Sequence, residues 1–257
     1  MSSHINISEH RIPLNTRYLL SSLFFFINIG LIYSQDTYNL IGDNTADLGS
    51  DCYQLTPMMG NQTGAAWNTT QIDLTCDFNW IGNFNLGVNG ADGMAFVFQN
   101  TGTSVPANNG LTGTPTVPQS FTLEFDTYEN NGSNTNDQGD PFPSCPAGPV
   151  SDHVSIYANG NATNPLVPAY CVADFDDGED HDLEINWSAD TKEFFAVIDG
   201  VYTISYTGDI VNNIFGSNSM VYYGFAARTG GVSSVQTFCH VSSNNTDCCS
   251  PDSGFVD

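Results

Sequence analysis

The chain has 257 residues, and its 28 acidic against 4 basic side chains give a formal net charge of −24 at neutral pH. Phosphate backbones and anionic lipids repel such a surface, which argues against nucleic-acid binding and leaves metal ions, neutral sugars or a basic protein as ligands. The length suits one large all-β domain. Solubility outside a cell is a simpler explanation of the acidity.

An apolar run near the N-terminus, residues 18–33, follows Arg11 and Arg17 and precedes Ser34. A basic, an apolar and a small-residue region in this order are typical of a secretory signal peptide. A membrane anchor is the alternative, but the run is just short of the roughly 18–20 residues that a spanning helix needs. We therefore expect residues 1–34 to be a cleaved signal peptide, with no membrane insertion afterwards and a secreted or cell-surface protein.

Short apolar runs alternate with turn residues from Cys52 onward, and helical periodicity is nowhere sustained for three turns. The predicted strands lie at residues 64–67, 71–80, 92–99, from 121 onward, 154–157, in a hairpin over 181–199, and at 201–206 and 220–229. Many strands without intervening helices indicate an antiparallel β-sandwich or jelly roll. We expect this domain over residues 35–240, beginning with a polar arm at 36–50. Residues 241–257 are expected to form a tail or linker without strand pattern.

Seven cysteines in an exported chain indicate disulfides rather than zinc, and no C-x-x-C spacing is present. Plausible pairs are Cys52 with Cys76, Cys145 with Cys171, and Cys239 with Cys248 or Cys249. An odd cysteine remains, either free or intermolecular. The three tryptophans are predicted to lie in the core rather than to stack on sugars.

The strand that begins at Phe121 carries a row of polar side chains. Because side chains alternate along a strand, one face should hold Glu124, Asp126, Tyr128 and Asn130, and the other Leu123, Phe125 and Thr127. Neighbouring carboxylates repel unless something positive lies between them. Carboxylates, an amide oxygen and a backbone carbonyl from a strand and its following loop are typical calcium ligands. The stretch, which continues through Asp137 and Asp140 to His153, therefore predicts a metal site that shapes a binding loop.

Three motifs, in this order, resemble the legume-type (L-type) lectins and their bacterial adhesin relatives. They are ADGMAFVF at residues 91–98, EFDTYEN…GDP…H at 124–153 and GFAARTGG at 224–231. The hairpin at 181–200 is similar to the same region of that concanavalin A-like fold. The resemblance covers residues 50–240, and it implies a fold and a set of ligand-binding positions.

In that family, the aspartate of the first motif follows a cis peptide bond and accepts hydrogen bonds from sugar hydroxyls, which implies this role for Asp92. Asn130 would direct its NH2 group toward the sugar, and backbone amides near Thr229, Gly230 and Gly231 would close the pocket. The implied partners are glycans or glycoproteins, with attachment to a larger surface assembly as a further expectation.

The resemblance also implies metal ligands. Calcium would be held by Asp126, the main-chain carbonyl of Tyr128, the side chain of Asn130, and Asp140. A second, transition metal such as Mn²⁺ would use Glu124, Asp126, Asp140 and His153. The loop between Asn130 and Asp140 is longer than in plant members, so Asp137 competes with Asp140 as a ligand.

Two other functions stay open beside a secreted or cell-surface, calcium-dependent and non-enzymatic carbohydrate-binding module. Glu124 and Glu129 also fit the E-x-D-x-x-E pattern of retaining β-glucanases, whose two carboxyl groups lie ~5–5.5 Å apart. That geometry requires a β-bulge, because a regular strand directs Glu129 to the other face. The third possibility is a calcium-stabilised adhesion or structural module without a sugar site.

Overall fold

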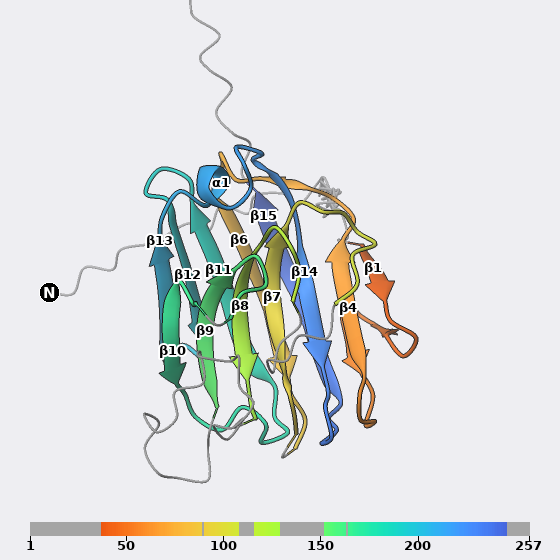
Figure 1. The fold of residues 1–257 in the computed structure, drawn as a ribbon. Helices are drawn as coiled ribbons and strands as arrows, with labels where there is room; N and C mark the ends of the chain where they lie inside the picture. Colours follow the sequence, from red (N-terminus) through yellow and green to blue (C-terminus); the bar gives the residue numbers. More distant parts are fainter. Residues whose placement is uncertain (1–36, 89, 108–115, 129–151, 163, 246–257) are drawn as a thin grey trace, which may run out of the picture. The chain divides into compact units, whose positions relative to one another are not determined.

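Two antiparallel β-sheets contain nearly all of the secondary structure (Figure 1). The computed structural model describes residues 37–88, 90–107, 116–128, 152–162 and 164–245. The strands are β1 (Tyr38–Ile41), β2 (Ala46–Gly49), β3 (Cys52–Thr56), β4 (Thr63–Asn68), β5 (Ile72–Asp73), β6 (Phe78–Asn85), β7 (Gly93–Gln99), β8 (Ser120–Asp126), β9 (His153–Ala158), β10 (Val167–Cys171), β11 (His181–Ser188), β12 (Glu193–Ile198), β13 (Tyr202–Thr207), β14 (Met220–Arg228) and β15 (Gln236–Asn245). The predicted all-β antiparallel sandwich is therefore confirmed.

The strand order differs from the chain order in both sheets. One sheet runs β1-β4-β14-β7-β8-β9-β10, with β5 paired to β14, and the other runs β13-β12-β11-β6-β15-β3-β2. The short helix α1 (Ile210–Asn213) connects β13 to β14. Among the described residues, no helix is long and apolar enough to cross a membrane.

Apolar side chains from both sheets form one large core cluster between them. In β6 and β11, buried residues alternate with more exposed ones, as expected for strands with one face on a core. Trp80 and Trp187 lie in this cluster, and Trp67 lies in a smaller one beneath the loop residues Val105 and Val117. The prediction that the tryptophans are core residues is confirmed.

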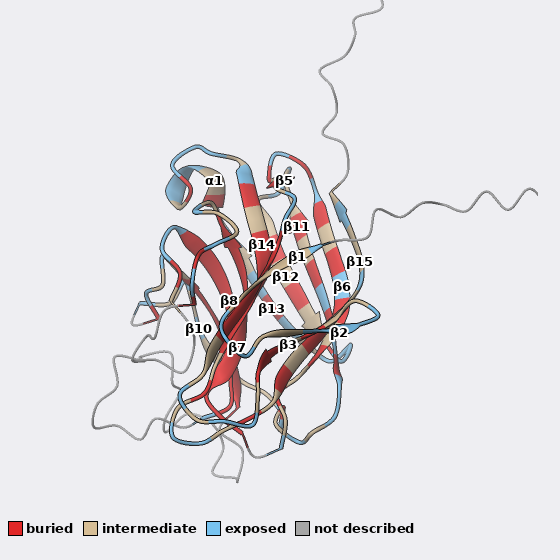
Figure 2. Ribbon diagram, turned by 90° about the vertical axis from the view of Figure 1, so that its right-hand side faces the viewer, coloured by how far each residue is buried: buried red, intermediate tan, exposed pale blue. Residues whose placement is uncertain are grey.

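The central strands β7 and β8 are buried along their whole length, as the red ribbons in Figure 2 show. Leu123 and Phe125 belong to the core cluster, so Glu124 and Asp126 lie on the opposite face of β8. The predicted sharing of faces is therefore correct up to Asp126, where the strand ends. This arrangement carries two carboxylates to one end of the sheet.

Several polar segments form strands that their sequence did not predict. The expected N-terminal arm contains β1 and β2, and β15 extends to Asn245, into the expected tail. The predicted strand at 71–80 is instead β5 and β6, separated by a turn in which the Asp73 carboxylate accepts a hydrogen bond from the Thr75 amide. The sequence did not predict these strands because the segments lack apolar alternation. Their order comes from backbone pairing with neighbouring strands.

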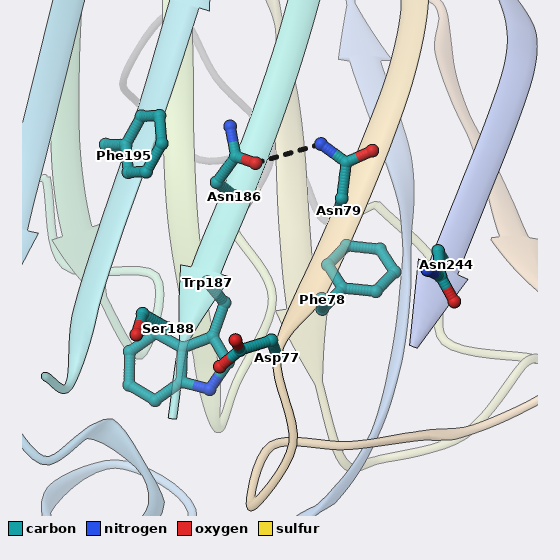
Figure 3. Close-up of a pocket in the computed structure, with 8 residues that line it drawn as sticks. All are labelled: Asp77, Phe78, Asn79, Asn186, Trp187, Ser188, Phe195 and Asn244. Carbon is teal, nitrogen blue, oxygen red and sulfur yellow. Dashed lines mark hydrogen bonds between the residues drawn. The ribbon is translucent and has the colours of Figure 1, made fainter. Parts of the chain in front are cut away.

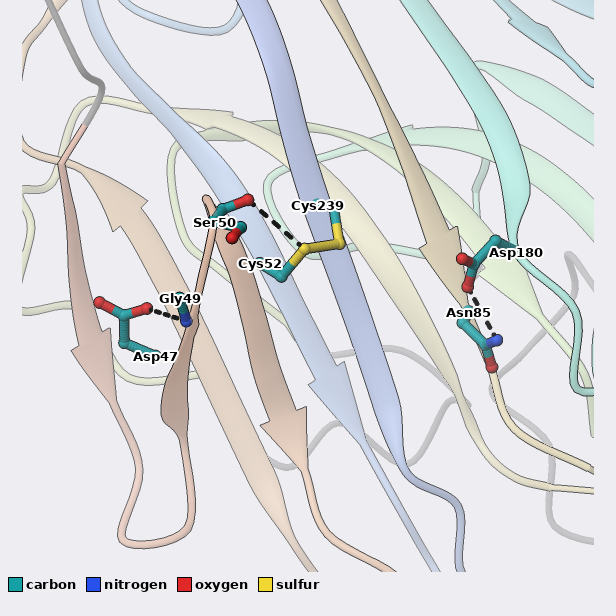
Figure 4. The surroundings of a disulfide bond; sticks show 7 residues. All are labelled: Asp47, Gly49, Ser50, Cys52, Asn85, Asp180 and Cys239. Atoms are coloured by element: carbon teal, nitrogen blue, oxygen red, sulfur yellow. Dashed lines mark hydrogen bonds between the residues drawn. A yellow bond between two sulfur atoms is a disulfide. The ribbon is translucent and has the colours of Figure 1, made fainter.

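A disulfide joins Cys52 on β3 to Cys239 on β15 (Figure 4). The two residues lie directly opposite each other in the sheet, with a Cα–Cα distance of 4.0 Å. The predicted pairs of Cys52 with Cys76 and of Cys239 with Cys248 or Cys249 are therefore wrong. Strand register brought together two cysteines that are 187 residues apart. Cys76 and Cys171 are also disulfide-bonded, and Cys145 lies outside the described residues.

Candidate functional site

Four neighbouring strands place one residue each in a continuous row at the end of the first sheet. Arg228 on β14 is opposite Gly93 on β7, Gly93 is opposite Asp126 on β8, and Asp126 is opposite His153 on β9. The chain neighbours of these residues, such as Ala227 and Val154, point into the core. The row therefore lies on the face of the sheet that is turned away from the core.

The predicted metal ligands in the described part of the chain gather on this face. Glu124 and Asp126 are fully buried, and His153 is 1% exposed. Tyr128 follows the end of β8, and its amide donates to Asp126 Oδ1 at 2.8 Å. Buried carboxylates are costly unless they are hydrogen-bonded, paired or bound to a metal. Oxygen ligands suit calcium and an imidazole suits a transition metal, so these residues fit the predicted ions.

The loop after Tyr128 contains the remaining predicted ligands. Asn130, Asp137 and Asp140 lie outside the described residues, as does Glu129 of the glucanase alternative. The choice between Asp137 and Asp140 as a ligand therefore stays a prediction.

The segment before β7 fixes Asp92 through its main chain. The Ala91–Asp92 peptide bond is cis, as the resemblance implied. The Asp92 amide donates to the Arg228 carbonyl at 2.9 Å, and the Asp92 carbonyl accepts from the Thr127 amide at 3.1 Å. Burial raises the pKa of the Asp92 carboxyl group, and the charge of Arg228 opposes that rise. Asp92 is 8% exposed, so its carboxylate meets solvent only over a small area.

The turn after β14 approaches Asp92 closely. A Cβ atom on Gly230 would lie 2.8 Å from Asp92 Oδ1, whereas one on Gly231 would meet nothing within 4 Å. The Thr229 amide donates a hydrogen bond to the Gln62 carbonyl. The Thr229 hydroxyl donates to the Met59 carbonyl and accepts from the Gln62 amide. The Thr229 amide therefore already has an acceptor. The role of the amides near Thr229, Gly230 and Gly231 in closing the sugar pocket stays a prediction.

An acidic cluster that the sequence analysis missed lies beside the same segment. Asp152, Asp174 and Asp176 have carboxylate oxygens within 4.8 Å of one another. Burial is the main cause that raises the pKa of Asp152 to about 6 and that of Asp176 to about 7. Asp176 also accepts a hydrogen bond from the Gly90 backbone. The acidic run from Asp174 to Asp177 was the available signal, but only the fold brings it to Asp152.

A cavity of about 220 Å³ lies elsewhere, on the outer face of the second sheet (Figure 3). Its floor is a registered row of Phe195, Asn186, Asn79 and Asn244 on four adjacent strands. The Asn79 side chain donates to Asn186 Oδ1 at 2.9 Å. None of the predicted ligand-binding residues lines this cavity.

The two antiparallel sheets, with carboxylates at the ends of central strands and a glycine turn against Asp92, define a lectin-like β-sandwich. Residues 32–242 match the legume lectin beta-barrel domain, and the chain belongs to this L-type lectin family. The family assigned from the three sequence motifs is thereby confirmed.

Solved structures share the fold of this chain, and one curated relative matches part of it. Lectin II from Ulex europaeus is similar with a TM-score of 0.61 and 19% identity, over 82% of this chain and 94% of that one. The exoplasmic/lumenal domain of VIP36, in a Ca²⁺/Man-bound form, gives 0.59 and 16%, over 82% and 83%. The pesticidal crystal protein Cry22Aa of Bacillus thuringiensis is 30% identical over 168 residues, which are 60% of this chain. The match covers only 23% of that protein's length.

Proposed function

We propose that this chain is a calcium-dependent carbohydrate-binding module that acts in secreted form or at the cell surface. The observation that carries the proposal is the convergence at one sheet end of the Asp92 carboxylate, the Gly230 main chain and the buried pair Glu124 and Asp126. An ionised carboxylate accepts several hydrogen bonds from a sugar's hydroxyl groups, and a nearby glycine lets the sugar reach backbone amides. Uncharged sugars also suit a strongly acidic chain, because its negative charge does not repel them.

Asp126, the Tyr128 carbonyl, Asn130 and Asp140 would hold calcium in this proposal. Glu124 and His153 would complete a second site for a transition metal such as Mn²⁺. A bound cation would neutralise the buried carboxylates and fix the ligand loop. The chain itself fixes Asp92 through its backbone bonds to Arg228 and Thr127. Modest affinity at one such site gains from several copies on a glycoprotein or a surface assembly.

The burial of Glu124 favours binding over hydrolysis. Glu124 would be the nucleophile of the glucanase alternative, yet its side chain is fully buried in β8. A nucleophile must reach the anomeric carbon of its substrate, and a polysaccharide does not reach a carboxylate that has no exposed surface. Relatives support the ligand class, since VIP36 was solved bound to Ca²⁺ and Man.

Glycan-array binding in calcium and in chelator tests the proposal. We expect binding that needs calcium and falls at least about 100-fold in Asp92→Ala and Asn130→Ala, since each loses polar contacts in the pocket. Asp190→Ala, on the exposed turn between β11 and β12, is the matched control and should bind like wild type. A folded wild type that binds no glycan would refute the sugar function.

The metal and the location have separate tests. Calorimetric titration of the chelated protein with Ca²⁺ and then Mn²⁺ should give binding that Asp126→Asn weakens, because a ligand charge is lost. Expression with the leader should give a secreted or surface protein whose N-terminus begins near Gln35. A protein that stays inside the cell with its leader uncleaved would contradict the proposed location.

A further inference from the structure

Arg228 is one of two Lys or Arg residues in the described part of the chain, and the other, Lys192, lies in the β11–β12 turn. That turn is at the far end of the sandwich, because β11 begins opposite Phe84, whose ring packs against Phe125 near the site at 4.6 Å. A chain so poor in cations therefore places one of them at the sheet end that carries its buried carboxylates.

Strand register directs the Arg228 side chain toward these acids. Arg228 is on the same face as Asp126, and Gly93 lies between them in the row. A Cβ atom on Gly93 would lie 2.3 Å from the Phe125 carbonyl oxygen, so only glycine fits there. Because glycine has no side chain, β7 places nothing over the sheet between Arg228 and Asp126.

Arg228 holds Asp92 at two points. Its carbonyl accepts the Asp92 amide at 2.9 Å, and its Nε atom lies 3.5 Å from Asp92 Oδ2. The second distance is that of an ion pair rather than a short hydrogen bond. A Cβ atom on Gly230 would lie 2.8 Å from Asp92 Oδ1 and 3.0 Å from Oδ2, so the Gly230 main chain comes close to the same carboxylate. The carboxylate is thus held near both a guanidinium group and a glycine backbone.

We propose that Arg228 is the positioning residue of the sugar site, whose guanidinium group keeps the Asp92 carboxylate ionised and aimed at the sugar hydroxyls. This inference rests on the proposed sugar function. The side chains of Arg228 and Asp92 are 21% and 12% exposed, so the pair is largely shielded from solvent. Loss of one partner from a shielded pair leaves the other charge uncompensated. Loss of Arg228 would therefore weaken sugar binding at the Asp92 carboxylate.

Three substitutions separate charge from shape. Arg228→Met and Arg228→Gln remove the charge, Arg228→Lys keeps it, and Lys192→Met removes the other described cation as the matched control. The measurements are affinity for the glycan that wild type binds best, calcium affinity, and thermal stability. We expect both neutral variants to lose about tenfold in glycan affinity and Arg228→Lys to recover most of it. Calcium affinity should not fall, because a positive charge near a cation site has been removed.

The outcomes distinguish this inference from the proposed function. Wild type without glycan binding overturns both. Wild-type binding with unchanged affinity in Arg228→Gln overturns only the role of Arg228. A loss that Arg228→Lys does not restore, with an equal loss of calcium affinity, would mean that the residue is merely structural. If Arg228→Met fails to fold, the Gln and Lys variants decide.

Discussion

At the scale of single residues, the site depends on close approach of the main chain to Asp92. Gly230 and Gly231 are adjacent, but only Gly230 is confined by the carboxylate. The sequence motif indicated both glycines equally. Their different surroundings follow from how the turn after β14 folds against the segment before β7.

Gly230→Ala should displace the Asp92 carboxylate and weaken glycan binding by about tenfold, since the added Cβ would lie 2.8 Å from Oδ1. Gly231→Ala is the control, because its Cβ would meet nothing within 4 Å. Affinity measurements on the two variants check the prediction. Equal affinities would show that Asp92 is not confined as described.

At the scale of elements, apolar alternation identified central strands such as β6 and β11, in which one face packs against the core. The edge strands β1, β2 and β10 were not predicted, and β2, for example, has one partner strand, β3, and exposes Asp47 and Leu48. Their order comes from pairing with a neighbour, and a local pattern does not encode that neighbour. The loop between β10 and β11 illustrates the same limit, because Asp174 and Asp176 meet Asp152 only after folding.

We expect Asp152 to make the free energy of unfolding depend on pH in the metal-free protein. Its folded-state pKa of about 6 is raised from 3.8, so the folded chain holds the proton more tightly than the unfolded chain. The contribution of Asp152 to the free energy of unfolding is therefore fully present below pH ~4. It is lost as the pH rises through ~6, by about 3 kcal/mol at most.

Asp152→Asn should flatten this slope, since the amide has no charge to bury and its oxygen still accepts from the Phe175 amide. Denaturant unfolding in chelator between pH 4 and 7 measures the effect, with Asp190→Asn as the exposed control. The same slope in Asp152→Asn and wild type would contradict the assignment to Asp152.

At the scale of the whole molecule, the second sheet pairs strands from the beginning of the domain sequence with its last strand. β15 lies between β3 and β6, and the Cys52–Cys239 disulfide locks the first of these pairings. Serine at either cysteine should lower the free energy of unfolding by about 2–4 kcal/mol, because the bond closes a loop of 187 residues.

Urea unfolding of Cys52→Ser, Cys239→Ser and the double variant checks the bond. The double variant should be no less stable than the single ones, since each removes the same bond. Additive losses would indicate that the two thiols act separately.

The sequence by itself determined the all-β class, the central strands, the faces of Leu123, Phe125 and Glu124, and the family, because alternation and short motifs are local properties. The fold decided the disulfide, the edge strands β1, β2 and β10, the acidic cluster and the setting of Arg228. Each of these depends on tertiary contacts, through strand pairing or loop packing, that bring together residues distant along the chain. The third motif gave Arg228 no role of its own, and only the fold places it beside Gly93 and Asp92.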